Sequence, residues 1–143
     1  MNHIVLVNIE NDTEKVKRQF SPPFGLLVAA SVLIRNKIDV IVRHIINTKE
    51  SIDELLRVSK GAVAVGFSVM TSPNILAAIE ASKRLHDDGI FVYWAGTHPT
   101  LLPVVVLRED YVDAVLRGEA ECNLYEIYNW RVGKYSPDKI DGL

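Results

Sequence analysis

Five short runs of β-branched and other apolar residues recur along the chain, at residues 4–7, 40–46, 62–67, 90–94 and 114–116. The runs are nearly continuous in apolar character rather than alternating, which is typical of strands covered on both faces. Segments with the apolar period of a helix separate them, and the links are short. The chain is therefore predicted to fold as a parallel, doubly wound α/β domain with right-handed crossovers.

Three segments between the runs and one segment after the last run carry apolar faces that predict helices, around residues 26–34, 52–56, 75–85 and 124–128. The fourth connection between runs, at residues 101–107, is short, and the sequence leaves its structure open. We expect residues 1–130 to form a single domain. The polar residues 131–143 are expected to be a surface extension and the start of a linker.

Residue types at the helix ends support this division. Ser51 is a favourable start for the second helix, and Pro73 would occupy the first position of the third. The run of two aspartates and a glycine at 87–89 suits the end of the third helix, because these residues tolerate a left-handed turn.

Composition narrows the class of protein. The single cysteine, Cys122, rules out a disulfide framework and a metal or iron–sulfur site made of cysteines alone within this chain, which fits a reducing cytoplasm. The net charge of -2 gives no reason to expect nucleic acid or an anionic membrane surface as a partner. The first residues do not resemble a signal peptide, and the longest near-apolar stretch, 24–34, is too short to span a bilayer. We expect a cytoplasmic protein, and the sequence does not indicate its oligomeric state.

In such a sheet, ligands bind beyond the carboxyl ends of the strands, so the loops there are the candidate site. The first strand is followed by a long polar stretch, residues 8–20, and then by two prolines and Gly25 before the helix. The prolines fix φ and the glycine allows close approach, although a stiff start of the helix explains them equally well. After the third strand, Ser68 would offer a small hydroxyl to a ligand, whereas Ser72 is better explained as a helix cap.

The loops after the fourth and fifth strands contain further candidates. Gly96 would allow close approach of another group, and His98 is expected to be a hydrogen-bonding side chain rather than a metal ligand. Gly118 ends the fifth strand and precedes two carboxylates, Glu119 and Glu121. These carboxylates favour the dipole of the following helix, so a catalytic pair is not needed to explain them.

Several common activities lack their motifs. The first strand is not followed by a dinucleotide fingerprint, and the chain contains neither a Walker-type phosphate loop nor a serine nucleophile elbow. A phosphoacceptor receiver would need aspartates and a lysine where this chain has Asn8, Glu10, Ser68 and Arg117. No catalytic residue is therefore predicted in this chain alone.

Four segments in this order resemble the B12-binding domain found at the N-terminus of cobalamin-dependent radical S-adenosylmethionine (SAM) enzymes. They are Pro22-Pro23-Phe24-Gly25-Leu26, Gly66-Phe67-Ser68-Val69-Met70-Thr71, Ala95-Gly96-Thr97-His98-Pro99-Thr100-Leu101-Leu102-Pro103 and Arg117-Gly118-Glu119-Ala120-Glu121. The resemblance implies a flavodoxin-like three-layer α/β/α sandwich. Its five-stranded parallel sheet would have the order 2-1-3-4-5, with cobalamin across the carboxyl edge.

The resemblance also implies a set of cofactor-binding residues. The corrin would be bordered by Pro22, Pro23, Phe24, Gly25 and Leu26. The pocket for the nucleotide tail would lie beside Ser68, Met70 and Thr71. A glycine-containing loop along that tail would consist of Gly96, Thr97, His98, Pro99 and Thr100. The last loop of the site would contain Gly118, Glu119 and Glu121.

The chain departs from the family in two informative ways. Residues 8–12 do not carry the Asp-x-His-x-x-Gly motif that supplies a cobalt-ligating histidine in methionine-synthase-like domains, and Ala95 stands where a second glycine is common. The resemblance therefore implies base-off cobalamin held without a histidine ligand, and we predict no metal ligand in this chain. The 4Fe-4S cluster and S-adenosylmethionine of the family belong to a radical SAM domain that is not in this chain.

The leading interpretation is a cobalamin-binding module of a B12-dependent radical SAM enzyme of methyltransferase or cyclase type. An alternative is the same fold with cobalamin binding lost, serving as an interaction or substrate-covering domain. A weaker alternative is a domain that binds another flat or nucleotide-like ligand.

Overall fold

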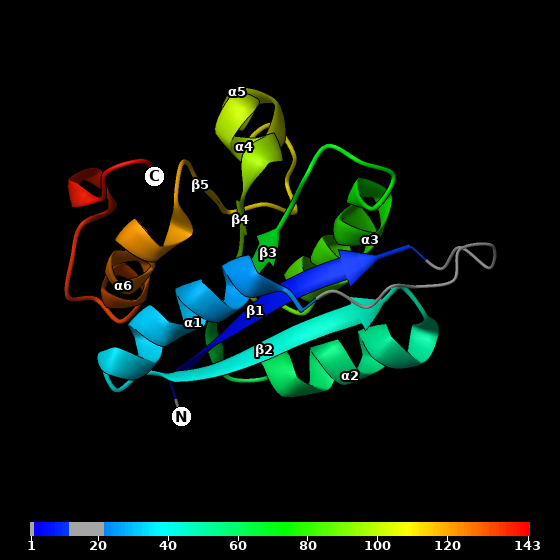
Figure 1. Ribbon diagram of the computed structural model, residues 1–143, viewed down its shortest axis with the longest axis horizontal. Coiled ribbons are helices and arrows are strands. Elements are labelled where there is room, and N and C mark those ends of the chain that lie inside the picture. Colours follow the sequence, from blue (N-terminus) through cyan, green and yellow to red (C-terminus); the bar gives the residue numbers. More distant parts are fainter. Residues whose placement is uncertain (1, 12–21) are drawn as a thin grey trace.

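The protein forms a five-stranded, all-parallel sheet between two layers of helices, as the computed structural model shows for residues 2–11 and 22–143 (Figure 1). The strand order is β2-β1-β3-β4-β5. The strands are β1 (His3–Glu10), β2 (Asp39–Ile46), β3 (Ala62–Ser68), β4 (Val92–Ala95) and β5 (Ala114–Leu116). This is the predicted flavodoxin-like fold.

The helices divide between the two faces of the sheet. α1 (Phe24–Arg35) and α6 (Ala120–Arg131) lie side by side on one face, while α2 (Lys49–Ser59) and α3 (Ile75–Asp87) cover the other (Figure 1). The connection left open by the sequence contains two short helices, α4 (Thr97–Leu101) and α5 (Pro103–Val106). In the part of the chain that the structure describes, no helix has both the length and the apolar character needed to cross a bilayer.

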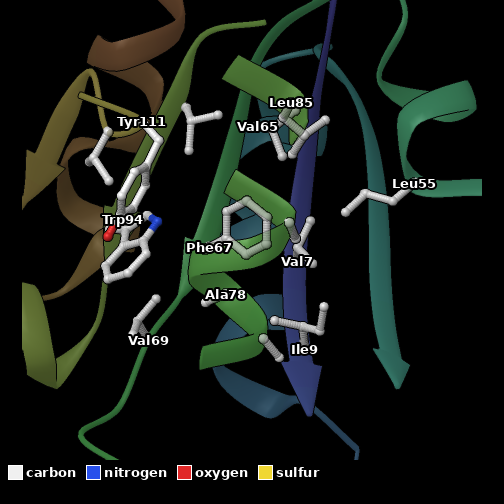
Figure 2. Packing of buried hydrophobic residues seen from close by; sticks show 14 of the residues in the cluster. Val7, Ile9, Leu55, Val65, Phe67, Val69, Ala78, Leu85, Trp94 and Tyr111 are labelled. Atoms are coloured by element: carbon white, nitrogen blue, oxygen red, sulfur yellow. The ribbon is translucent and has the colours of Figure 1, made fainter. Parts of the chain in front are cut away.

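Two apolar clusters hold the layers together, one on each face. Alternate residues of β3 and β4 point to opposite faces, so Phe67 and Trp94 pack under α2 and α3, whereas Tyr93 packs under α1 and α6. Figure 2 shows the first cluster, with Phe67 and Val7 on neighbouring strands and Tyr111 beside Trp94. Burial of strands on both faces explains why their sequences are nearly continuous in apolar character.

Some element bounds differ from the prediction. α2 begins two residues before Ser51 because Thr48 is its N-cap, with its hydroxyl accepting a hydrogen bond from the Ser51 backbone N–H at 3.2 Å. α3 begins at Ile75 with Asn74 as its N-cap, so Pro73 lies before the helix rather than at its first position. Ser72 does not cap the helix, although its hydroxyl accepts a hydrogen bond from the Asn74 backbone N–H.

The first strand is longer than its apolar run. β1 continues to Glu10, so Asn8 and Glu10 lie in the strand rather than in the following loop. Asn8 pairs in register with His44, and the Glu10 carboxylate contacts the His44 Nε2 at 2.8 Å. Polar residues are accommodated here because this end of the pair faces the open carboxyl edge. The remainder of the predicted loop, residues 12–20, lies outside the described residues.

The last residues of the chain return to the end of β5. The Arg117 backbone N–H donates a hydrogen bond to the Gly142 carbonyl at 2.7 Å, and Ile140 is buried. The C-terminus accordingly lies near β5 in Figure 1. The polar segment after α6 is thus attached to the carboxyl edge of the sheet.

A buried side-chain hydrogen bond joins α3 to β4. The indole N–H of Trp94 donates to the Ser82 hydroxyl at 2.9 Å, and both residues are almost fully buried. We expect Ser82→Ala to lower the free energy of unfolding by about 1–3 kcal/mol, because it leaves a buried donor without an acceptor. Denaturant unfolding followed by circular dichroism measures this difference. Ser31→Ala is the control, since the Ser31 hydroxyl bonds at the surface; equal stability of the two variants would contradict the prediction.

Candidate functional site at the carboxyl edge

A cavity opens at the carboxyl ends of β3, β4 and β5, between the first turns of α1 and α6, with Leu6 from the middle of β1 among its lining residues. We call it the edge cavity; its empty volume is about 550 Å³, including the open mouth. Among the predicted site residues it brings together Gly25, Leu26, Ser68, Gly96, Gly118, Glu119 and Glu121. Four loops far apart in the sequence therefore meet at one concave site, as parallel strand order requires.

The floor of the edge cavity is formed by residues that sequence reasoning did not select. Gly66 of β3 pairs with Tyr93 of β4, and a Cβ atom at Gly66 would lie 2.0 Å from the Tyr93 Cζ. The glycine thus makes room for a phenol ring lying against the strand. Glycine within an apolar strand signals such close approach, but it does not indicate which residue approaches.

Tyr93 places a hydroxyl at this floor. The residue lines the edge cavity and is only 2% exposed, and burial raises the pKa of its phenol, so the hydroxyl stays protonated. Leu6, Ala29 and Leu124, which also line the cavity, have no polar side-chain atoms. The floor therefore combines apolar walls with a hydrogen-bond donor.

The loop after β4 is packed against the loop after β3. Gly96 has φ 102°, and a Cβ atom there would lie 2.9 Å from the Val69 carbonyl oxygen. The Val69 carbonyl also accepts a hydrogen bond from the His98 backbone N–H at 3.0 Å. The group that approaches Gly96 closely is therefore the protein backbone at Val69, and Gly96 also lines the edge cavity.

His98 is the hydrogen-bonding residue that the sequence predicts. Its Nδ1 lies 2.9 Å from the Thr71 hydroxyl, and both His98 and Pro99 are buried. The contact joins the loops after β3 and β4 and orients the imidazole. Neither Thr71 nor His98 lines the edge cavity.

Thr97 and Thr100 lie at a second hollow that adjoins the edge cavity at Gly96, Gly118 and Glu119. The Thr100 hydroxyl accepts a hydrogen bond from the Gly118 backbone N–H at 3.0 Å. This bond links α4 to the turn after β5. The two turns that border the mouth are thus held together by a side chain.

The carboxylates of the last loop lie at the start of α6. Glu119 is the N-cap residue and Glu121 lies in the first turn, where both favour the helix dipole, as expected. Both also line the edge cavity, so its mouth carries negative charge. The oxygens of these carboxylates could accept hydrogen bonds from donor groups of a ligand.

The remaining predicted residues border the site without lining the edge cavity. Pro22, Pro23 and Phe24 form the start of α1, and the Phe24 side chain is 67% exposed. Met70 is 66% exposed and lines a separate hollow on the α3 side of the sheet, together with Ser68. Ser68 thus faces both hollows from the end of β3.

Metal ligands do not gather at this edge. Within residues 2–11 and 22–143 there is no group of three or more histidine, cysteine, aspartate or glutamate side chains placed to hold a metal ion. Cys122 is exposed and free.

The fold and the edge cavity define a flavodoxin-like α/β domain with a candidate ligand site between α1 and α6. Residues 15–127 match the family model of the B12 binding domain. The match covers most of the sequence, so the chain belongs to the B12-binding domain family.

Two solved structures share this fold. They are the cobalamin-dependent S-adenosylmethionine radical enzyme OxsB with aqua-cobalamin and S-adenosylmethionine bound, at a TM-score of 0.77, and OxsB with aqua-cobalamin bound, at 0.74. Each is 16% identical and matches 99% of this chain, which spans 20% of the OxsB chain. A search of curated proteins gave no match.

Proposed function

We propose that this chain binds cobalamin and presents it to a radical SAM domain. The observation that carries the proposal is the edge cavity itself, a hollow with apolar walls at the carboxyl edge of a B12-binding fold. Its small wall residues and the buried Tyr93 hydroxyl fit a flat aromatic group that carries a hydrogen-bond acceptor. The proposed occupant is the nucleotide tail of cobalamin.

The residues of this chain would hold the cofactor in two regions. Ser68 and the turn at Gly118 would contact the tail as it enters the edge cavity. The start of α1, with Phe24 exposed beside it, would border the corrin. When bound, cobalamin supplies cobalt-centred organometallic chemistry, and the protein contributes binding, orientation and exclusion of water.

We further propose that the cofactor is bound base-off and without a histidine ligand. Asn8 and Glu10, which stand where the histidine motif of methionine-synthase-like domains would begin, lie in β1 and carry no imidazole. His98 is buried and has its Nδ1 bonded to Thr71, which does not leave it free to turn toward a ligand.

The expected result is that the purified chain retains cobalamin. Mixed with hydroxocobalamin and desalted, it should keep the visible absorbance of the corrin, with a spectrum of the base-off form. The same measurement after unfolding the chain in denaturant is the control, and it should show loss of the corrin. Loss of absorbance from a chain shown to be folded by circular dichroism would contradict cobalamin binding. A spectrum or structure with a histidine–cobalt bond would contradict the base-off proposal alone.

A second candidate function is an interaction domain that has lost cobalamin binding. One observation favours a partner surface: the α4–α5 region exposes Leu101, Val104, Val105 and Leu107, each at least half exposed. An apolar surface of this kind is common at protein contacts. It is compatible with both candidates, whereas the edge cavity favours the first. The retention experiment therefore distinguishes them.

A further inference from the structure

The Tyr93 hydroxyl has no hydrogen-bond partner among the residues that the structure describes. Tyr93 is 2% exposed. Buried hydroxyls are generally hydrogen-bonded, because leaving one without a partner costs free energy. The Tyr93 hydroxyl oxygen is not one of the fully enclosed side-chain atoms that lack a partner, so it opens into the edge cavity, where it can donate to a group that the cavity receives.

The surrounding packing keeps the hydroxyl at the cavity floor. The phenol ring lies over Gly66, where even a methyl group would collide with it, and β4 pairs with both β3 and β5. Leu6 and Leu124 flank the floor and cannot accept a hydrogen bond through their side chains. The donor is thus fixed in place before any ligand binds, which reduces the entropy lost on binding.

We propose that Tyr93 is a specificity-determining residue that donates a hydrogen bond to the aromatic base of the nucleotide tail; this rests on the proposed function. The benzimidazole of cobalamin has a ring nitrogen that accepts a hydrogen bond when it is not coordinated to cobalt. Burial raises the pKa of the Tyr93 phenol, which keeps the donor protonated at all ordinary pH values. The site would therefore select corrinoids with a base of this kind over corrinoids that lack one.

The test compares Tyr93→Phe with the unmodified chain, using hydroxocobalamin and cobinamide, a corrinoid without the nucleotide tail. The substitution removes only the hydroxyl. We expect it to weaken cobalamin binding by about 3- to 10-fold, as for the loss of one hydrogen bond, and to leave cobinamide binding unchanged. Titration followed by the visible spectrum of the corrin gives both affinities.

A second readout separates ligand recognition from a structural role. Because the hydroxyl has no internal partner, Tyr93→Phe should leave the Tm of the ligand-free chain unchanged or raise it. Tyr128→Phe, on the same face of the sheet but outside the edge cavity, is the matched control and should bind both corrinoids normally.

The outcomes are distinct. A Tyr93→Phe variant that binds cobalamin as tightly as the unmodified chain, or that loses cobalamin and cobinamide equally, would overturn the inference while leaving the proposed function intact. An unmodified chain that binds neither corrinoid would overturn the proposed function and this inference with it. A loss confined to cobalamin, without a lower Tm, supports both.

Discussion

Gly66→Ala is expected to lower the free energy of unfolding by about 3 kcal/mol, at the upper end of the range for overpacking a core. The added Cβ would lie 2.0 Å from the Tyr93 Cζ and 2.2 Å from its hydroxyl oxygen, so the phenol must leave its position. The ring could move only toward the edge cavity, which would cost it its packing against β3. Denaturant unfolding of the ligand-free chain measures the change.

Gly25→Ala is the matched control for this prediction. Gly25 lies in the first turn of α1, and nothing would lie within 4 Å of a Cβ atom there. Alanine favours helix over glycine, so this variant should be more stable than the unmodified chain, by about 0.5–1 kcal/mol. Gly66→Ala should also cost less when it is combined with Tyr93→Ala than alone, because the two side chains would then no longer collide. Equal costs in both backgrounds would contradict the proposed clash.

Ser68→Leu is expected to weaken cobalamin binding at least about tenfold, which corresponds to roughly 1.4 kcal/mol or more. Ser68 lies at the end of β3, lines the edge cavity and is partly exposed. A leucine there would occupy space that the nucleotide tail is proposed to enter. The fold should survive because no hydrogen bond to another described residue depends on the Ser68 hydroxyl. Titration with hydroxocobalamin measures the affinity.

Ser31→Leu provides the control for Ser68→Leu, since Ser31 is a serine of α1 that does not line the edge cavity. It should bind cobalamin as the unmodified chain does. If Ser68→Leu also bound normally while remaining folded, the tail would not pass Ser68. Gly96 is a poor choice for the same purpose. Its φ of 102° and its contact with the Val69 carbonyl mean that any side chain there would disturb the loop as well as the cavity.

The fold could be predicted almost completely from the sequence, because each strand of a covered parallel sheet has its own apolar run. The bounds of helices were predicted less well, since capping depends on which of several polar residues reaches the backbone. Thr48 and Ser51 are both favourable N-cap residues. Which of them caps α2 depends on the path of the backbone after β2, and the structure has Thr48 in this position. Pro73 likewise suits a first helical position, but the chain turns once more before Asn74.

The loops of the candidate site could be predicted from the sequence, but the residues at the floor of the edge cavity could not. The strand-end loops are visible in sequence because glycines, hydroxyl residues and carboxylates follow each apolar run. The floor is different, because Gly66 and Tyr93 belong to separate runs, and their contact depends on the register between β3 and β4. The contact between Thr71 and His98 depends in the same way on how two loops pack. The apolar pattern of one strand does not tell which residue of the neighbouring strand lies opposite, so these contacts could not be predicted from it.

The hydrogen bond from the Arg117 backbone N–H to the Gly142 carbonyl couples the position of the C-terminal segment to the mouth of the edge cavity. Arg117 directly precedes Gly118, whose turn borders the mouth and is bonded in addition to Thr100 of α4. A displacement of residues near 142 would therefore be transmitted through two hydrogen bonds to both sides of the mouth. A substitution that moves the C-terminal segment should therefore also alter the shape of the edge cavity at its mouth.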